Sequence, residues 1–416
     1  MLEYPNFLNK IFDKLEKNSA KPIIIGGFVR DSLLNIASQD IDIEVYNVSS
    51  FKKLENLLKE FGSINSVGKS FGVCKLNINK YNLDFTLPRI DSKISSGHLG
   101  FDIEIDKNLD FTTASRRRDF TMNAIGYDVV NKKLLDPYGG IKDLSNKTLK
   151  MVDAKTFVED PLRVLRAVQF CSRYELKMNN ELFLLCKNMI EKNLLLELTK
   201  ERIYEEIKKN LLKSKKPSLG FELLKKLDAL KYFTNLDLLN EKSWHRSMDT
   251  IDAIASLTIT NKKRKEVLML ASICYTFNAS QIESFISSLS NDKSLLKSIT
   301  ILCENLNTIL DMSSNRFSNY DVLKLATYVN IEDLSILSDA LFGVGKDVFA
   351  KAKELNVVNK KAPAILLGRD LISAGLKPSN EFSYILDSAY EAQIRGSFSS
   401  LVEAKEWLDN FLANHQ

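Results

Sequence analysis

The sequence predicts a small mixed α/β domain at the N-terminus, followed by a remainder that is all α-helical. Up to about residue 145, short β-branched runs alternate with segments of helical periodicity, a pattern typical of a mixed α/β domain. Beyond Thr156, helical periodicity dominates. The chain of 416 residues also exceeds what one hydrophobic core usually organises, so we expect two or more domains.

The first part of the chain alternates helix and strand patterns. Phe7, Ile11 and Leu15 lie four apart and predict an amphipathic helix over residues 5–19. A short strand over 21–25 ends at Gly26-Gly27, and a helical pattern resumes at Asp31. The remaining expectations are a strand over 40–46, a helix over 51–61, strands near 71–78 and 81–87, a polar loop over 90–109, and helices over 194–212, 219–230 and 251–257.

The composition sets broad limits on location and partners. The net charge of +5 is compatible with a polyanionic partner but does not demand one. The five cysteines include no C-x-x-C pair, so we expect reduced, mostly buried thiols and a cytoplasmic location. The N-terminus does not resemble a secretion signal, and no apolar run approaches the roughly 20 residues that cross a bilayer. We therefore expect no membrane association, and we infer no stable protein partner.

Three acids alternate along the strand expected over 40–46. Successive strand residues point to opposite faces, so Asp40, Asp42 and Glu44 share one face and the intervening apolar residues share the other. Carboxylates this close repel one another unless cations lie between them, and Mg²⁺ is a natural partner in phosphoryl or nucleotidyl transfer. Asp84 is placed to supply a third carboxylate, with Glu44 as the alternative. For a D-x-D motif taken alone, which is short, a solvated sheet edge is the default interpretation.

The double glycine before these acids adds weight to the catalytic interpretation. A tight turn at Gly26 and Gly27, opening a helix, lets backbone N–H groups approach a phosphate, and Arg30 adds a charged donor. Two glycines by themselves usually mark only a turn. Followed by the acids, they indicate a nucleoside triphosphate held against metal.

Several motifs, in this order, resemble the class II tRNA nucleotidyltransferases (CCA-adding enzymes) and bacterial poly(A) polymerases, within the DNA polymerase β-like superfamily. The resemblance covers about residues 20–210. The motifs are Gly26-Gly-Phe-Val-Arg-Asp31, Asp40-Ile-Asp42, Arg117-Arg-Asp-Phe-Thr-Met-Asn-Ala124, Asp136-Pro-Tyr-Gly-Gly-Ile-Lys-Asp-Leu144, Glu159-Asp-Pro-Leu-Arg-Val-Leu-Arg-Ala167 and Glu201-Arg-Ile-Tyr-Glu205.

The resemblance implies a polymerase β-like catalytic head over residues 1–145, a base-recognising helical neck over 146–215, and a helical body and tail over 216–416 that bind tRNA. It also assigns roles to motif residues. Mg²⁺ would bind Asp40 and Asp42, which with Asp84 form the catalytic set. The incoming nucleotide would contact Asp119 through its sugar and Arg117 and Arg118 through its phosphates, with Asn123 and Arg166 in the same nucleotide site. A solvated basic turn is the simpler explanation for the arginines alone.

Asp160 and Arg163 lie three residues apart, and we expect both on one face of a helix, where a surface ion pair is the default interpretation. The resemblance instead makes them a protein template for the base. Cytosine and adenine both present an amino group beside a ring-nitrogen acceptor, so one carboxylate and one guanidinium would accept these bases. Uracil and guanine would leave the same groups unpaired.

The activity implied is template-independent addition of CCA to the 3′ end of tRNA from CTP and ATP, with release of pyrophosphate. A poly(A) polymerase is the nearest alternative, and Gly72 lies where those enzymes tend to be basic. Enzymes adding only CC or only A share the motifs, and a noncatalytic RNA-binding protein is a more distant alternative.

Gln169 stands where many relatives have Arg, and Glu201, Arg202, Glu205 and Glu206 are expected to brace a helix.

Overall fold

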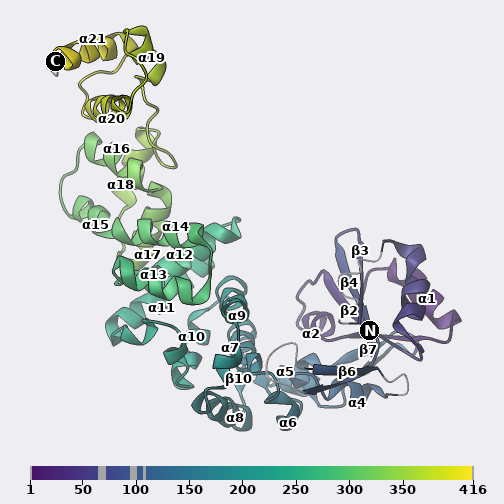
Figure 1. Cartoon of the computed structure of the whole chain (residues 1–416). Helices are drawn as coiled ribbons and strands as arrows, with labels where there is room; N and C mark the ends of the chain where they lie inside the picture. Colours follow the sequence, from purple (N-terminus) through teal and green to yellow (C-terminus); the bar gives the residue numbers. More distant parts are fainter. Residues whose placement is uncertain (1, 64–71, 94–100, 106–108, 415–416) are drawn as a thin grey trace. The chain divides into compact units, whose positions relative to one another are not determined.

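The computed structural model describes residues 2–63, 72–93, 101–105 and 109–414. The chain forms two compact units, one ending at Phe233 and one beginning at Thr234 (Figure 1). The first unit opens with the mixed sheet and continues into helices, and the second is built from helices. The predicted fold class is thereby confirmed.

A six-stranded sheet organises the start of the first unit. Its order is β3-β4-β2-β1-β7-β8, and among these neighbours only β2 and β4 run parallel. The strands are β1 (Lys21–Ile25), β2 (Asp40–Tyr46), β3 (Val73–Ile78), β4 (Tyr81–Thr86), β7 (Gly126–Asp128) and β8 (Lys133–Leu135). This order places the acidic strand β2 between β1, which ends at the double glycine, and β4, which carries Asp84.

The predicted helices of this region are present with shifted ends. They are α1 (Leu8–Lys17), α2 (Gly27–Leu33) and α3 (Phe51–Leu58), the last followed by a short 3-10 turn over 59–61. Leu8, Ile11 and Leu15 form the buried face of α1. Helix α2 begins four residues before the predicted Asp31, because Gly26 takes a positive φ that turns the chain directly into the helix.

The prediction of a polar loop over 90–109 is wrong in part. Strands β5 (Arg89–Lys93) and β6 (Phe101–Ile105) pair antiparallel in a separate two-stranded sheet, with Arg89 opposite Ile105. Polar and apolar residues alternate over 101–105, so a local period of two was present there in a region whose overall polarity suggested a loop, whereas residues 89–93 include only one apolar residue and give no such signal. Gly97, His98 and Gly100, which the loop prediction included, lie outside the described residues.

Short elements lead from the sheet to a helical layer within the first unit. Helix α7 packs against α9 and α10, and a two-stranded parallel pair, β9 with β10, lies beside its C-terminal end. The elements are α4 (Phe111–Ser115), η3 (Thr121–Asn123), α5 (Gly140–Ser145), β9 (Thr148–Leu149), α6 (Ala154–Phe157), α7 (Leu162–Tyr174), β10 (Lys177–Met178), α8 (Asn180–Glu191), α9 (Lys200–Lys213) and α10 (Ser218–Lys226).

The second unit consists of helices, and polar side chains cap the starts of several of them. The side chains of Asn240, Asn261 and Asn278 each accept a backbone N–H at the beginning of a helix. Helix α12 is buried almost all round and forms the centre of this unit. The helices are α11 (Glu241–Ser256), α12 (Lys262–Cys274), α13 (Ala279–Leu289), α14 (Lys293–Glu304), α15 (Leu306–Ser314), α16 (Asn319–Tyr328), α17 (Ile331–Phe342) and α18 (Lys346–Glu354).

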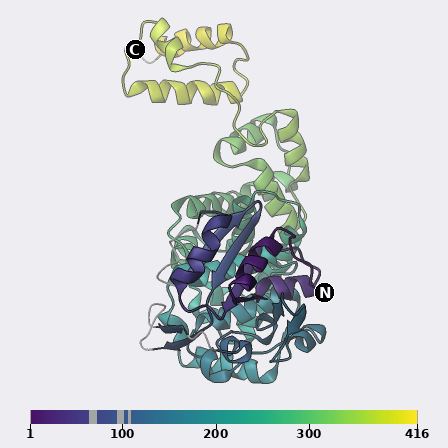
Figure 2. The same cartoon turned by 90° about the vertical axis from the view of Figure 1, so that its right-hand side faces the viewer.

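Three C-terminal helices pack together around a small core of their own. They are α19 (Gly368–Ser373), α20 (Glu381–Ile394) and α21 (Leu401–Ala413), shown in yellow-green to yellow in Figure 2. Leu371, Ile385, Phe398 and Leu408 are among the buried residues of this core.

Across the described residues, no helix combines the length and apolar character that a membrane span requires. Four of the five free cysteines are buried and Cys303 is half-buried, as predicted.

Candidate active site

The sheet register brings the predicted acids of two strands together. In the parallel pair of β2 and β4, Asp42 lies opposite Asp84 and Asp40 lies opposite Asn82. The side chains of Asp40 and Asp42 are exposed, and Asn82 Nδ2 donates to Asp40 Oδ1 at 2.7 Å. Lys75 of β3 donates from Nζ to Asp84 Oδ2 at 3.1 Å. Two solvent-accessible carboxylates therefore lie beside a third that already has a cationic partner.

Glu44 belongs to the same face of β2 but has a different environment. Its side chain is fully buried, Oε1 accepts from Arg117 Nη2 at 3.0 Å, and Oε2 accepts from the Tyr46 hydroxyl at 2.5 Å. Both oxygens of the Glu44 carboxylate therefore already accept hydrogen bonds, one from Arg117 and one from Tyr46. Of the two alternatives for a third carboxylate, the geometry favours Asp84 over Glu44.

The carboxyl group of Asp42 lies in an unfavourable electrostatic setting. Its side chain reaches solvent, but protein atoms surround the carboxyl group, and this burial raises its pKa above the ordinary value. Arg118 counteracts the rise, whereas the charges of Asp84 and Asp40 add to it. A further cation beside Asp42 would relieve this repulsion.

The donor set suits a hard cation, although no preformed cage is present. Among the residues that the structure describes, no three His, Cys, Asp or Glu side chains gather closely enough to hold a metal ion. Mg²⁺ in nucleotide enzymes is held by one or two carboxylates together with the phosphates of the substrate. Asp40 and Asp42 offer those two carboxylates from the exposed end of β2.

The turn before α2 depends on glycine at one position. Gly26 has φ of 66°, and a Cβ atom there would lie 2.9 Å from Arg118 Nη1 and 3.8 Å from Asp42 Oδ2. Gly27 has only ordinary contact distances, with Arg30 Nη2 3.7 Å from a Cβ placed there. The N–H of Gly26 donates to the Ile125 carbonyl at 3.1 Å, so it is already used within the fold.

Arg30, expected as a phosphate donor, is buried instead and its donors point into the protein. Nε donates to Asp31 Oδ1 at 2.8 Å, Nη1 donates to Asn123 Oδ1 at 2.6 Å, and Nη2 lies 2.7 Å from Asp31 Oδ1. Its guanidinium lies over the rings of Phe170 and Tyr174. This geometry suits a residue that orients Asn123 rather than one that reaches a ligand.

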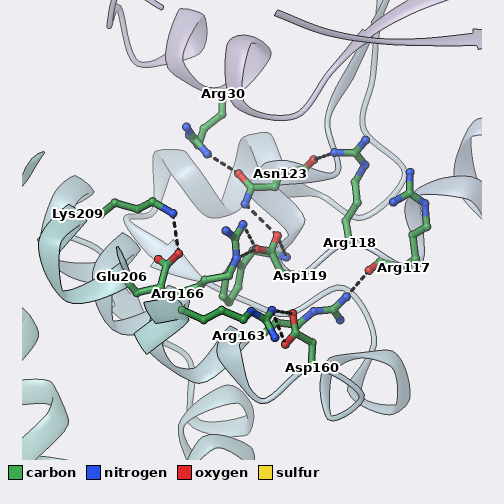
Figure 3. Close-up of polar contacts among 12 residues, drawn as sticks. Arg30, Arg117, Arg118, Asp119, Asn123, Asp160, Arg163, Arg166, Glu206 and Lys209 are labelled. Carbon is green, nitrogen blue, oxygen red and sulfur yellow. Dashed lines mark hydrogen bonds and ion pairs between the residues drawn. The ribbon is translucent and has the colours of Figure 1, made fainter. Parts of the chain in front are cut away.

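Asp119 and Arg166 form the centre of the polar cluster in Figure 3. Arg166 donates to Asp119 Oδ2 from Nε at 2.8 Å and from Nη2 at 2.5 Å. Asp119 Oδ1 accepts from the Phe120 N–H and from Asn123 Nδ2, both at 2.9 Å. Burial by itself would raise the pKa of Asp119, but Arg166 and the hydrogen bond from Asn123 hold it below its ordinary value.

Arg117 and Arg118 both lie near the acids. Arg118 is half-buried, its Nη1 donates to the Asn123 carbonyl at 3.1 Å, and the protein atoms around its guanidinium lower its pKa although Glu44 and Asp42 oppose this. Its Nε is buried without a hydrogen-bond partner among the described residues. Arg117 joins Glu44 on one side, and its backbone carbonyl accepts from Arg163 Nη2 at 2.6 Å.

The expectation that Asp160 and Arg163 share one helix is wrong. Helix α7 begins at Leu162, because Pro161 occupies its N-cap, and Asp160 lies before the helix with Oδ1 accepting the Leu162 N–H at 3.2 Å. The ion-pair partner of Asp160 is Arg202 of α9, at 3.2 Å. Arg163 donates from Nη1 to the Thr156 carbonyl at 2.7 Å. Both side chains are thus held in place at the start of α7.

Arg202 and Glu206, which we expected only to stabilise their own helix, belong to this polar cluster. Arg202 holds Asp160, and Glu206 is buried near Arg166, with Oε1 accepting from Lys209 Nζ at 2.7 Å (Figure 3). Glu206 contributes to raising the pKa of Arg166, after the larger effect of Asp119. The motif around Glu201 pointed to this helix, but its contacts with α7 depend on helix packing that the motif does not contain.

The double glycine at 139 and 140 is held by local contacts. Asp136 accepts the N–H groups of Gly140 at 2.7 Å and Ile141 at 3.0 Å. A Cβ atom at Gly140 would collide with the Thr121 carbonyl. Glycine at 140 therefore permits close packing against η3.

Comparison with protein families gives two matches, both within residues 23–237. A family described as "Poly A polymerase head domain" matches residues 23–150, which contain the sheet and its acids. A second, described as "Probable RNA and SrmB- binding site of polymerase A", matches residues 176–237.

Curated relatives match over longer stretches. The chain is 36% identical over 235 residues to the "Multifunctional CCA protein" of Pseudoalteromonas atlantica, covering 55% of this chain and 55% of that protein. It is 30% identical over 300 residues to the "CCA-adding enzyme" of Buchnera aphidicola subsp. Baizongia pistaciae, covering 68% of each. The matched region thus spans between about half and two thirds of these relatives.

Solved structures share the fold over nearly the whole chain. The structure described as "The complex structure of CCA-adding enzyme with ATP" superimposes with a TM-score of 0.74 at 20% identity, covering 99% of this chain and 95% of the other. The "Thermotoga maritima CCA-adding enzyme complexed with tRNA_CCA" gives 0.71 at 21% identity, covering 100% and 97%. Taken with the sequence relatives, these matches show that the chain belongs to the family of CCA-adding enzymes and bacterial poly(A) polymerases.

Proposed function

We propose that this protein adds C, C and A to the 3′ end of tRNA, using CTP and ATP and releasing pyrophosphate in the cytoplasm. The observation that carries the proposal is the register that places Asp42 opposite Asp84 and beside Asp40, next to the Gly26 turn. The names of the relatives from Pseudoalteromonas and Buchnera support the choice of CCA addition. The described complexes of related folds with ATP, CTP and tRNA agree with the substrates.

Asp40 and Asp42 would hold Mg²⁺ together with the nucleotide phosphates. When bound, Mg²⁺ would withdraw charge from the phosphate oxygens and stabilise pyrophosphate as it leaves. Asp84 lies beside Asp42 in the sheet, where its carboxylate would accept a hydrogen bond from the RNA 3′ hydroxyl and help to remove its proton. Lys75, the present partner of Asp84, would hold that carboxylate in place on the sheet.

The nucleotide would lie between the acids and the start of α7. Arg117 and Arg118 would face its phosphates, and Gly27 would let the backbone come close to them. Asp119 would accept a hydrogen bond from the ribose hydroxyl. Both of its oxygens already accept hydrogen bonds from Phe120, Asn123 and Arg166, so the hydroxyl would add to these donors or replace one of them. We assign Arg30, Asn123 and Arg166 to orienting this acid rather than to direct ligand contact.

Base selection would take place at Asp160 and Arg163. The carboxylate would accept from the amino group of cytosine or adenine, and the guanidinium would donate to the ring nitrogen. Arg202 would keep Asp160 pointed at the base, since it is the cation paired with that carboxylate. The anchoring of Arg163 by two backbone carbonyls would fix its orientation in the same way.

The distribution of charge suggests where RNA phosphates bind. Residues 198–233 contain 10 Lys and Arg against 5 Asp and Glu, and this stretch lies within the match to the RNA-binding family. Residues 234–416 contain 19 Lys and Arg against 22 Asp and Glu. We therefore assign the main electrostatic contact with RNA to α9 and α10, and a role in gripping tRNA by shape to the helical body and tail.

In domain terms, we propose a catalytic head over 1–145, a base-recognising neck over 146–215, and a tRNA-binding body and tail over 216–416. Poly(A) addition is the second candidate, because the family matched by residues 23–150 is described by that activity. Addition of CC alone or of A alone would be a narrower form of the proposed CCA addition.

An incorporation assay separates these candidates. Purified protein with Mg²⁺ receives a tRNA transcript that ends before CCA, with CTP alone, ATP alone or both. We expect two residues from CTP alone, none from ATP alone, and three from both. A ladder of adenosines on an unrelated RNA would replace the proposal with poly(A) synthesis.

A further inference from the structure

We propose that Asp31 and Tyr174, neither of which reaches the expected nucleotide site, are positioning residues for nucleotide binding. They hold Arg30, and through it they orient Asn123, which in turn holds both Asp119 and Arg118. The proposal rests on the proposed function for the identity of the nucleotide. The contacts that carry it are independent of that function.

One face of α7 provides the base of this arrangement. Arg166, Phe170 and Tyr174 are spaced four residues apart, so they form a single row along the helix. Phe170 and Tyr174 stack with ring centroids 6.0 Å apart, and the Arg166 guanidinium lies 5.3 Å from the Phe170 ring centroid. The row therefore presents a cation at one end, two rings in the middle and a hydroxyl at the other end.

Arg30 of α2 lies on this row and has no freedom to leave it. Its guanidinium carbon is 5.2 Å from the Phe170 centroid and 4.8 Å from the Tyr174 centroid, and the side chain is only 5% exposed. Asp31 is equally buried and accepts from Arg30 Nε at 2.8 Å and from the Tyr174 hydroxyl at 2.7 Å. Tyr174 thus fixes the carboxylate that fixes Arg30.

The other end of Arg30 sets the position of Asn123. Arg30 Nη1 donates to Asn123 Oδ1 at 2.6 Å, and Asn123 Nδ2 donates to Asp119 Oδ1 at 2.9 Å (Figure 3). The Asn123 backbone carbonyl accepts from Arg118 Nη1 at 3.1 Å. A shift of Arg30 therefore disturbs both the acid expected at the sugar and the cation beside Asp42.

The contacts form a closed ring, because Arg166 at the far end of the α7 row binds Asp119 again. A buried charge pair adds little net stability compared with well-packed apolar residues, but it does impose one orientation on its partners. Arg173 Nη2 also lies 3.6 Å from Asp31 Oδ2, so the Asp31 carboxylate has two arginine partners, Arg30 and Arg173. These contacts fix the positions of the polar side chains that connect α2 to α7.

Tyr174→Phe tests this device with little risk to folding, because it keeps the ring that stacks on Phe170. The measurement is the dissociation constant of CTP and of 2′-deoxy-CTP, by calorimetric titration of the full chain without RNA. We expect CTP affinity to fall between about 2-fold and 30-fold, the range seen for network positions that contact no ligand. The preference for CTP over its deoxy analogue should shrink by at least about 2-fold.

Tyr390→Phe is the matched control, since it removes a tyrosine hydroxyl that donates to one backbone carbonyl, that of Ala362, in the second unit. It should bind both nucleotides as the wild type does. Asp31→Asn keeps the shape of the side chain and removes its charge, so it should weaken CTP binding at least as much as Tyr174→Phe. A melting temperature for each variant separates loss of binding from loss of fold.

The proposal is overturned if Tyr174→Phe and Asp31→Asn bind CTP and its deoxy analogue like the wild type, even when their melting temperatures fall. That result would leave the ring a structural feature only. Failure of the proposed function has a different signature. The wild type would then bind nucleotide but add no CCA to tRNA, while the effect of Tyr174→Phe on binding would still decide the positioning role.

Discussion

Gly26→Ala offers a test in which the structure sets the expected magnitude. Gly26 has φ of 66° and ψ of −123°, a conformation in which a residue with a Cβ is strained by about 1–3 kcal/mol. The new Cβ would lie 2.9 Å from Arg118 Nη1, which is held by the Asn123 carbonyl. Displacing that charged hydrogen bond costs about 1.5–3 kcal/mol more. We expect a loss of about 3 kcal/mol or more in the free energy of unfolding of the first unit.

The control is Gly343→Ala, because Gly343 has φ of 72° but nothing within 4 Å of the added Cβ. It bears only the backbone cost, about 1–2 kcal/mol. Urea denaturation gives the stability of each variant, and calorimetric titration gives its CTP affinity. Gly26→Ala should lose both stability and CTP binding, whereas Gly343→Ala should keep CTP binding. The reasoning is refuted if Gly26→Ala costs no more than the control and still binds CTP normally.

Three further outcomes are expected. Asp42→Ala should abolish nucleotide incorporation and leave tRNA affinity, measured by gel shift, largely unchanged; retained turnover would rule out its metal role. Arg163→Ala should raise UTP incorporation relative to CTP in single-turnover assays, and an unaltered ratio would count against the protein template. Glu391 is bound by Lys324, Tyr320 and Arg395, and these contacts lower its pKa to about 2. Its folded pKa lies below the unfolded one, so its contribution is present above about pH 4.5 and is lost as pH falls toward 2. Glu391→Gln should therefore cost about 1 kcal/mol at pH 7 and progressively less below pH 4.5 in thermal melts. A cost that is constant with pH would contradict this, and Glu354→Gln, at the exposed pair with Lys351, is the control.

Local patterns in the sequence were sufficient for the elements that carry the acids. The bounds of β1 and β2 were predicted correctly, because alternation with period two is a property of the strand itself. The same alternation placed Asp40 and Asp42 on one face. Asp84 was expected beside them, and the sheet register puts it opposite Asp42.

The sequence says least where partners come from distant segments. Glu44 shares its face with Asp42, and it is a buried ion-pair partner of Arg117 through a contact that spans 73 residues. The phosphate role of Arg30 stays a prediction, and the contact of its Nη1 with Asn123 spans 93 residues. Asp160 and Arg163 were expected on one helix, but α7 begins at Leu162 with Pro161 at its N-cap, which leaves Asp160 outside it. Periodicity does not contain this information.

We expect the acids of β2 and β4 and the side chains before and within α7 to add together a fixed short sequence without a template. The decisive measurement is sequencing of the RNA 3′ ends after incubating the protein with Mg²⁺, all four nucleoside triphosphates and tRNA that lacks its terminus. We expect ends that read CCA and stop. Ends that contain U or G, or that extend into long adenosine tails, would contradict this expectation.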